Sequence, residues 1–205
     1  MLTKSHIVSL ALLAFAGSGG FLLFAFMMLM TWPLPVPRPT LEGVKPAKVS
    51  STHTRETHER RLKPSRITFG VPDGWGRSDI GGIQSGYSRV DVYAWKIPPG
   101  IYLDTAEQRR AAAELEMRTE FAQLTGAREV TLAGKPAVEI AGAREGSKDW
   151  TLVTYGYVDG IGVRVRCVTG DSKVYGGPLA HTRGDDWGKT LPVCAAVVAS
   201  LKVER

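Results

Sequence analysis

The stretch "AGKPAVEIAGAREGSKDWTLVTYGYVDGIGVRVRCVTG", residues 133–170, decides the fold. Its runs of β-branched and aromatic residues are separated by glycine-containing turn signals, "AGK" and "DG". Short glycine turns between such runs are typical of β-hairpins. With the run just before it, the stretch predicts four strands joined as an antiparallel meander, at about 128–132, 136–142, 149–158 and 161–169.

Further elements are predicted on both sides of the meander. "SRVDVYAW" alternates apolar and polar residues as a half-buried strand does. "DTAE", residues 104–107, matches the capping box that opens a helix. The predicted elements are strands at 67–71 and 88–95 and helices at about 104–124 and 190–201. This order predicts an α+β domain, in which an antiparallel sheet has helices packed on its core face.

The same stretch, with this order of elements, resembles the PsbP-like α/β/α sandwich superfamily over about residues 66–203. The matching signature is "G-x-P-A", Gly134 to Ala137, which enters a strand and precedes two long strands joined by a tight turn. The resemblance implies a domain that binds or braces other proteins, in a photosynthetic or other bioenergetic membrane assembly for example. It carries over no catalytic residue, because the superfamily has no shared catalytic motif.

The N-terminal residues 1–31 are predicted to be an uncleaved transmembrane anchor. Residues 7–30 contain no charged side chain, and a helix of that length crosses the roughly 30 Å hydrocarbon core of a bilayer. Ala16 and Gly20 have the small-xxx-small spacing that lets a second membrane helix approach closely. The competing interpretation is a signal peptide cleaved at the A-x-A sequence of 14–16, which would leave a strongly apolar new N-terminus.

Residues 32–66 are predicted to be a linker. "WPLPVPRPT", residues 32–40, has a proline at every second position and favours a polyproline II rod. The linker holds eight Lys or Arg against three Glu, so it is a solvated tether or contacts anionic lipid headgroups. The remaining 67–205 holds 17 basic and 17 acidic residues, and this balance argues against a nucleic-acid partner.

No catalytic motif, cofactor site or metal site is identified. The chain contains no Walker loop, G-x-S-x-G, H-E-x-x-H or C-x-x-C. His181, Asp185 and Asp186 in the loop 175–190 are weighed as metal ligands, but partner binding through Trp187 is preferred. We therefore expect a protein that is not an enzyme.

A partner surface is predicted on the side of the sheet that faces away from the core. Aromatic side chains and arginine are enriched at protein interfaces. Strand alternation is expected to place these residues on that side: Tyr93, Trp95, Glu139, Tyr155, Tyr157, Arg164 and Arg166. The four expected to contact other membrane-protein subunits, together with Trp187, are Tyr93, Trp95, Arg164 and Arg166.

Cys167 and Cys194 are the two cysteines of the chain, each on the predicted core side of its element. They are expected to form a disulfide, which implies an oxidising compartment; the alternative is two buried free thiols. The sequence thus predicts a single-pass protein of the inner (cytoplasmic) membrane whose domain lies in the periplasm. Its expected role is that of an accessory or stabilising subunit; the alternative is a free-standing periplasmic envelope protein that binds a ligand or metal.

Overall fold

The computed structural model describes residues 38–56, 66–79, 81–86, 88–97, 103–145, 150–158, 160–169 and 187–204. The predicted anchor with Ala16 and Gly20, and the residues His181, Asp185 and Asp186, lie outside this described part. Within it, no helix has both the length and the apolar character needed to cross a bilayer. All described residues belong to one compact unit, Arg38–Arg205.

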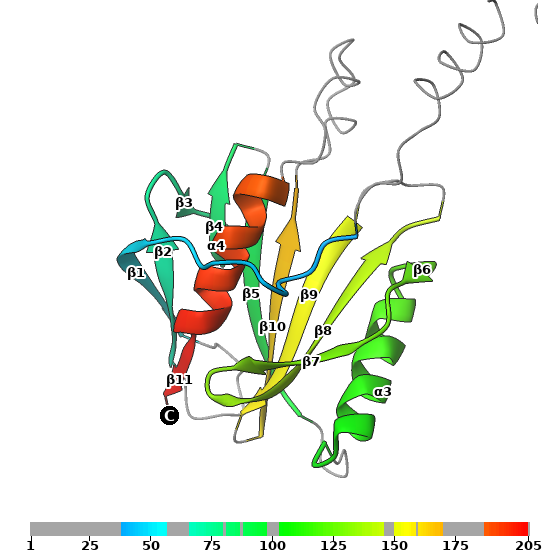
Figure 1. Cartoon of the computed structure of the whole chain (residues 1–205). Coiled ribbons are helices and arrows are strands. Elements are labelled where there is room, and N and C mark those ends of the chain that lie inside the picture. The colour runs from blue at the N-terminus through cyan, green and yellow to red at the C-terminus, as the bar shows by residue number, and fades with distance from the viewer. Residues whose placement is uncertain are drawn as a thin grey trace, which may run out of the picture. The chain divides into compact units, whose positions relative to one another are not determined.

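The main sheet is antiparallel throughout the described residues, with the order β3-β4-β5-β10-β9-β8-β6 and with β7 paired to β8 (Figure 1). Its strands are β3 Gly76–Arg77, β4 Gly82–Ser85, β5 Ser88–Lys96, β6 Gln123–Leu124, β7 Arg128–Leu132, β8 Lys135–Ala143, β9 Trp150–Val158 and β10 Ile161–Val168. The predicted α+β class and the predicted meander, β7 to β10, are confirmed. Ala133 and Gly134 both have positive φ, 51° and 73°, as a two-residue hairpin turn requires.

A second, smaller sheet has the order β1-β2-β11, with β1 Val49–Glu56, β2 Arg66–Pro72 and β11 Lys202–Glu204. Strand β1 pairs with β2 in antiparallel register. The polarity of its residues predicts a linker, so this strand differs from the expectation. Nearly every side chain of β1 is exposed, so the strand has no apolar alternation to reveal it. The folded domain therefore begins before the predicted boundary at residue 67.

The two helices lie on opposite faces of the main sheet. Helix α3, Ala106–Arg118, packs on β8 through Ala113 and Met117. Helix α4, Trp187–Ser200, packs against β2, β5 and β10. The prediction that both helices share one core face is wrong, because β8 is buried on both faces along almost its whole length.

The predicted capping box is shifted by one residue. Thr105 is the N-cap: its hydroxyl accepts a hydrogen bond from Gln108 N at 3.2 Å, and Gln108 Oε1 accepts one from Thr105 N at 3.0 Å. Helix α3 also ends earlier than expected, with Thr119 as its C-cap. Phe121 follows the helix and is buried against the same face of the sheet.

A disulfide joins Cys167 of β10 to Cys194 of α4, with 6.2 Å between their Cα atoms. Both residues are buried. The bond closes a separation of 27 residues, and in the chain-entropy model such a loop stabilises the fold by about 3.5 kcal/mol. It fixes α4 to the centre of the main sheet.

Residues 38–48, here called the strap, cross the α4 face of the sheet before β1 begins (Figure 1). At one end Thr40 and Leu41 bind Glu139 of β8. At the other end Ala47 N donates a hydrogen bond to Pro192 O of α4 at 2.8 Å. This part of the predicted linker is therefore attached to the domain.

Candidate interaction surface

The residues of β5 and β10 that point away from α4 form a surface here called the arginine face. Cys167, Val165 and Val163 face α4, so strand alternation places Arg164 and Arg166 on the opposite side. In the register of β10 with β5, Arg164 is opposite Tyr93 and Arg166 is opposite Asp91. The arginine face consists of Arg89, Asp91, Tyr93, Trp95, Arg164 and Arg166.

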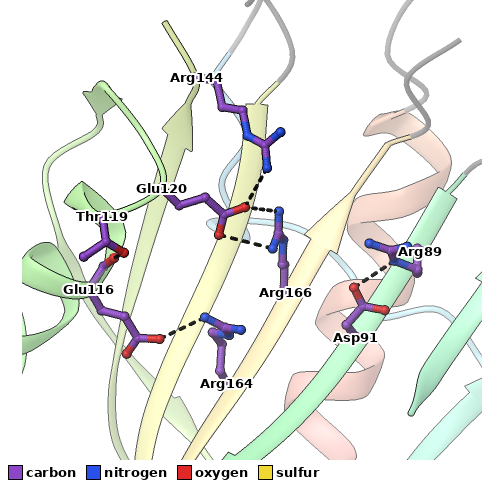
Figure 2. Close-up of polar contacts among 8 residues, drawn as sticks. All are labelled: Arg89, Asp91, Glu116, Thr119, Glu120, Arg144, Arg164 and Arg166. Carbon is purple, nitrogen blue, oxygen red and sulfur yellow. Dashed lines mark hydrogen bonds and ion pairs between the residues drawn. The ribbon is translucent and has the colours of Figure 1, made fainter. Parts of the chain in front are cut away.

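Both central arginines are bound by carboxylates from the α3 segment (Figure 2). Arg166 makes two hydrogen bonds to Glu120, at 2.7 and 3.3 Å. Arg164 Nη1 donates to Glu116 Oε1 at 2.9 Å, and Arg144 Nη2 binds Glu120 Oε1 at 3.1 Å. The sequence missed Glu116 and Glu120 as members of this surface.

A geometric signal for these pairs is present in the sequence. Four residues of helix rise by about 6 Å, and two residues of a strand advance by about 6.6 Å. Glu116 and Glu120 are therefore spaced to match Arg164 and Arg166 when a helical segment lies along the strand. The arginines are partly exposed, 23% and 18% at their side chains, so their predicted contact with a partner stays a prediction.

Asp91 is the buried acid of the arginine face, with a side chain that is 0% exposed. Arg89 Nε donates to its Oδ2 at 2.8 Å, while Oδ1 has no hydrogen-bond partner among the described residues. Burial raises the pKa of the Asp91 carboxyl, and the charges of Arg89, Arg166 and Arg164 oppose that rise. Gly82 lies opposite Asp91 in β4, where a Cβ would overlap the backbone of β5.

The aromatic residues of the arginine face have defined supports. The Trp95 ring lies directly over Gly162, where a Cβ would overlap it. The ring meets Tyr155 edge-on, at 6.4 Å between centroids and 81° between planes. The guanidinium of Arg164 lies 4.7 Å from the centroid of Tyr93, within the range of a cation–π contact.

A pocket of about 240 Å³ lies beside Trp95, between α3 and the sheet. It is lined by Trp95, Ile97, Leu103, Ala112, Leu115, Glu116, Thr119 and Tyr157. Leu115 is 71% exposed at the rim of this pocket. Burial, with a further contribution from the charge of Glu116, raises the pKa of Tyr157 to about 12.

Three residues of the predicted partner surface are buried in the domain. Tyr155 is on the expected side but is buried under α3, 1% exposed. Trp187 is buried at the start of α4, 6% exposed. Glu139 is on the opposite face, because its neighbours Val138 and Ile140 are the residues that face α3. Among the described residues, no three His, Cys, Asp or Glu side chains are grouped as a metal site would need.

No protein-family model matches the chain, and no curated protein matches its sequence. Among solved structures, the chain is similar to the crystal structure of LpqN, described as involved in cell envelope biogenesis of Mycobacterium tuberculosis. The identity is 14% and the TM-score 0.49, over 76% of this chain and 93% of that one. None of these comparisons supports the resemblance to the PsbP-like superfamily.

Proposed function

We propose that this chain is a non-enzymatic accessory subunit of a membrane protein complex, and that its arginine face binds another protein. The observation that carries the proposal is the composition of this face. Helix α3 covers β8 on this side of the sheet. Strands β5 and β10 carry guanidinium groups and aromatic rings on the same side, where a sheet buried under a helix would carry apolar side chains. Arg, Tyr and Trp are the residue types enriched at binding hot spots.

The chemistry of the face suggests what kind of partner surface would complement it. Its three arginines, at 89, 164 and 166, and the adjoining Arg144 meet three carboxylates: Asp91 of the face and the adjoining Glu116 and Glu120 (Figure 2). The side chains of Arg89 and Arg144 are the more exposed, 39% and 67%. A partner surface that offers carboxylates beside aromatic groups would complement this arrangement in charge.

The proposed location is the periplasmic side of the inner membrane. The disulfide between Cys167 and Cys194 supports an oxidising compartment. The uncharged run at 7–30 supports a single membrane anchor. Together they favour a domain that is held outside the cytoplasm, beside the membrane subunits that it binds.

A second function is favoured by the pocket beside Trp95: a free-standing envelope protein that binds a small apolar ligand. Ligand pockets are concave and mostly apolar, with few polar groups. This one combines apolar and aromatic walls with the carboxylate of Glu116 and the hydroxyl of Thr119.

Purification of the full chain from its own membrane in mild detergent separates the two functions. Membrane subunits that co-purify in fixed stoichiometry are expected for the accessory subunit, and a monomer that carries a small apolar molecule is expected for the second function. Arg89→Glu should reduce the yield of co-purified subunits. Arg110→Glu, an exposed arginine of α3 outside the arginine face, is the control. Equal yields from both variants would refute the role of this face.

A further inference from the structure

The strap is attached to the domain through one buried carboxylate. Glu139 is 3% exposed. Its Oε1 accepts hydrogen bonds from Thr40 Oγ1 at 2.8 Å and from Arg128 Nη2 at 2.8 Å. Its Oε2 accepts one from Leu41 N at 3.1 Å. A buried carboxylate needs such donors, and two of them come from the strap.

Neighbouring contacts reinforce this attachment. Thr40 Oγ1 also accepts a hydrogen bond from Glu42 N at 3.2 Å, which closes a turn of the strap. The guanidinium of Arg38 lies 5.6 Å from the ring centroid of Trp150 at the start of β9. The strap is thus held at its first residues by β8 and β9, and by α4 through Ala47.

The attachment shortens the free tether. Without it, residues 32–48 would separate the predicted anchor from β1, the first strand of the domain. With it, only residues 32–37 lie between the anchor and Arg38, the first attached residue. The seven residue steps from the end of the anchor at residue 31 to Arg38 span at most about 25 Å when fully extended, and about 22 Å as polyproline II.

We propose that Glu139, by holding the strap, keeps the strap side of the domain against an anionic lipid surface. The proposal rests on the proposed function, since it requires the anchor. Arg38, Lys45 and Lys48 of the strap are exposed and positively charged, against the single acid Glu42. Basic groups within a Debye length of anionic headgroups are attracted to them, so the short tether and the charge of the strap act in the same direction.

Hydrogen exchange of the full chain in nanodiscs tests the attachment itself. Thr40→Val removes one donor to Glu139 without altering the sheet, and Glu139→Ala removes the acceptor. Exchange in peptides containing Leu41 should accelerate by about tenfold or more, as expected for the loss of a hydrogen bond to a charged group. Thr54→Val is the control, because Thr54 bonds Thr68 of β2 and not the strap. Unchanged exchange at Leu41 in both Thr40→Val and Glu139→Ala would overturn the proposal.

Energy transfer to acceptor-labelled lipids tests the position of the strap. A dye on Pro46→Cys, in the strap, should transfer more efficiently than one on Ala111→Cys of α3, on the opposite face of the sheet. Glu139→Ala should reduce the difference in transfer efficiency between the two dyes. An insertion of flexible residues before Arg38 should also reduce it, yet leave Leu41 protected.

Each outcome identifies what has failed. Equal transfer from both dyes, or a difference that Glu139→Ala leaves unchanged, would overturn the membrane-facing role. Transfer that does not depend on anionic lipid would refute the role of the basic residues. A chain that does not insert into nanodiscs refutes the proposed anchor, and with it the membrane-facing role, while exchange at Leu41 still reports whether Glu139 holds the strap.

Discussion

Arg166 and Glu120 face each other across the gap between β10 and the end of α3, joined by two hydrogen bonds of 2.7 and 3.3 Å (Figure 2). The pair connects the sheet to the segment that follows α3, next to the buried ring of Phe121. Arg166 is also one of the residues that the sequence predicts to contact a partner protein, and here it is bound to Glu120. Any partner of this surface therefore meets Arg166 already bound and oriented.

We predict that this pair makes a small but measurable contribution to stability. The side chains are 18% and 30% exposed, so solvent screens the pair and a coupling energy of about 1 kcal/mol or less is expected. A double-mutant cycle with Arg166→Met and Glu120→Gln, followed by urea unfolding, measures it. The pair of Arg144 with Glu120, in which Arg144 is 67% exposed, should give a smaller value. A larger coupling for Arg144 would contradict the assignment.

The disulfide is predicted to be a main source of stability. Replacing Cys167 and Cys194 together by Ala should lower the free energy of unfolding by about 3.5 kcal/mol, the loop-closure value for this separation. Reduction of the wild-type protein should produce a similar loss. Non-reducing mass spectrometry of protein alkylated before lysis should show the two peptides linked, and two alkylated thiols in that experiment would refute the periplasmic location.

The sequence predicts the meander well because hairpin turns are local. "AGK" and "DG" specify both the turns and the strands beside them, and no distant contact is needed. Strand β1 is different, since its polar residues form a strand only where β2 supplies a partner. Its pairing depends on tertiary context, to which single-sequence periodicity gives no access.

The candidate surface is predictable only in part, for a related reason. Alternation places Arg164 and Arg166 correctly on one side of β10. It fails at Glu139, because β8 is buried on both faces and shows no alternation of apolar and polar residues. A carboxylate in such a strand belongs to the interior and needs donors, and two of the residues that donate to Glu139 are 98 and 99 residues away in the sequence.

We predict that Gly162 is required for the position of Trp95. A methyl group at Gly162 would overlap the indole ring, so Gly162→Ala should displace the ring and cost about 1–3 kcal/mol, as overpacking does. Urea unfolding measures the cost, and near-UV circular dichroism reports the ring. Gly188→Ala in α4 is the matched control: apart from its chain neighbours and its own helix backbone, no atom of the described residues lies within 4 Å of the added methyl group, and the helix should gain up to about 1 kcal/mol. Equal effects would argue against the close contact of Trp95 with Gly162.

The last prediction concerns the pH dependence of stability at Asp91. Burial raises the pKa of this carboxyl above its ordinary value of 3.8, so the folded state binds the proton more tightly than the unfolded state. The resulting stabilisation is complete below pH 3.8 and is lost as pH rises through the folded pKa. Asp91→Asn, which does not titrate, should therefore gain stability relative to wild type between acid and neutral pH. Urea unfolding of both proteins at a series of pH values measures this difference. A difference that stays constant would show that the charges of Arg89, Arg166 and Arg164 cancel the effect of burial on the pKa, and one that shrinks toward neutral pH would show that they outweigh it.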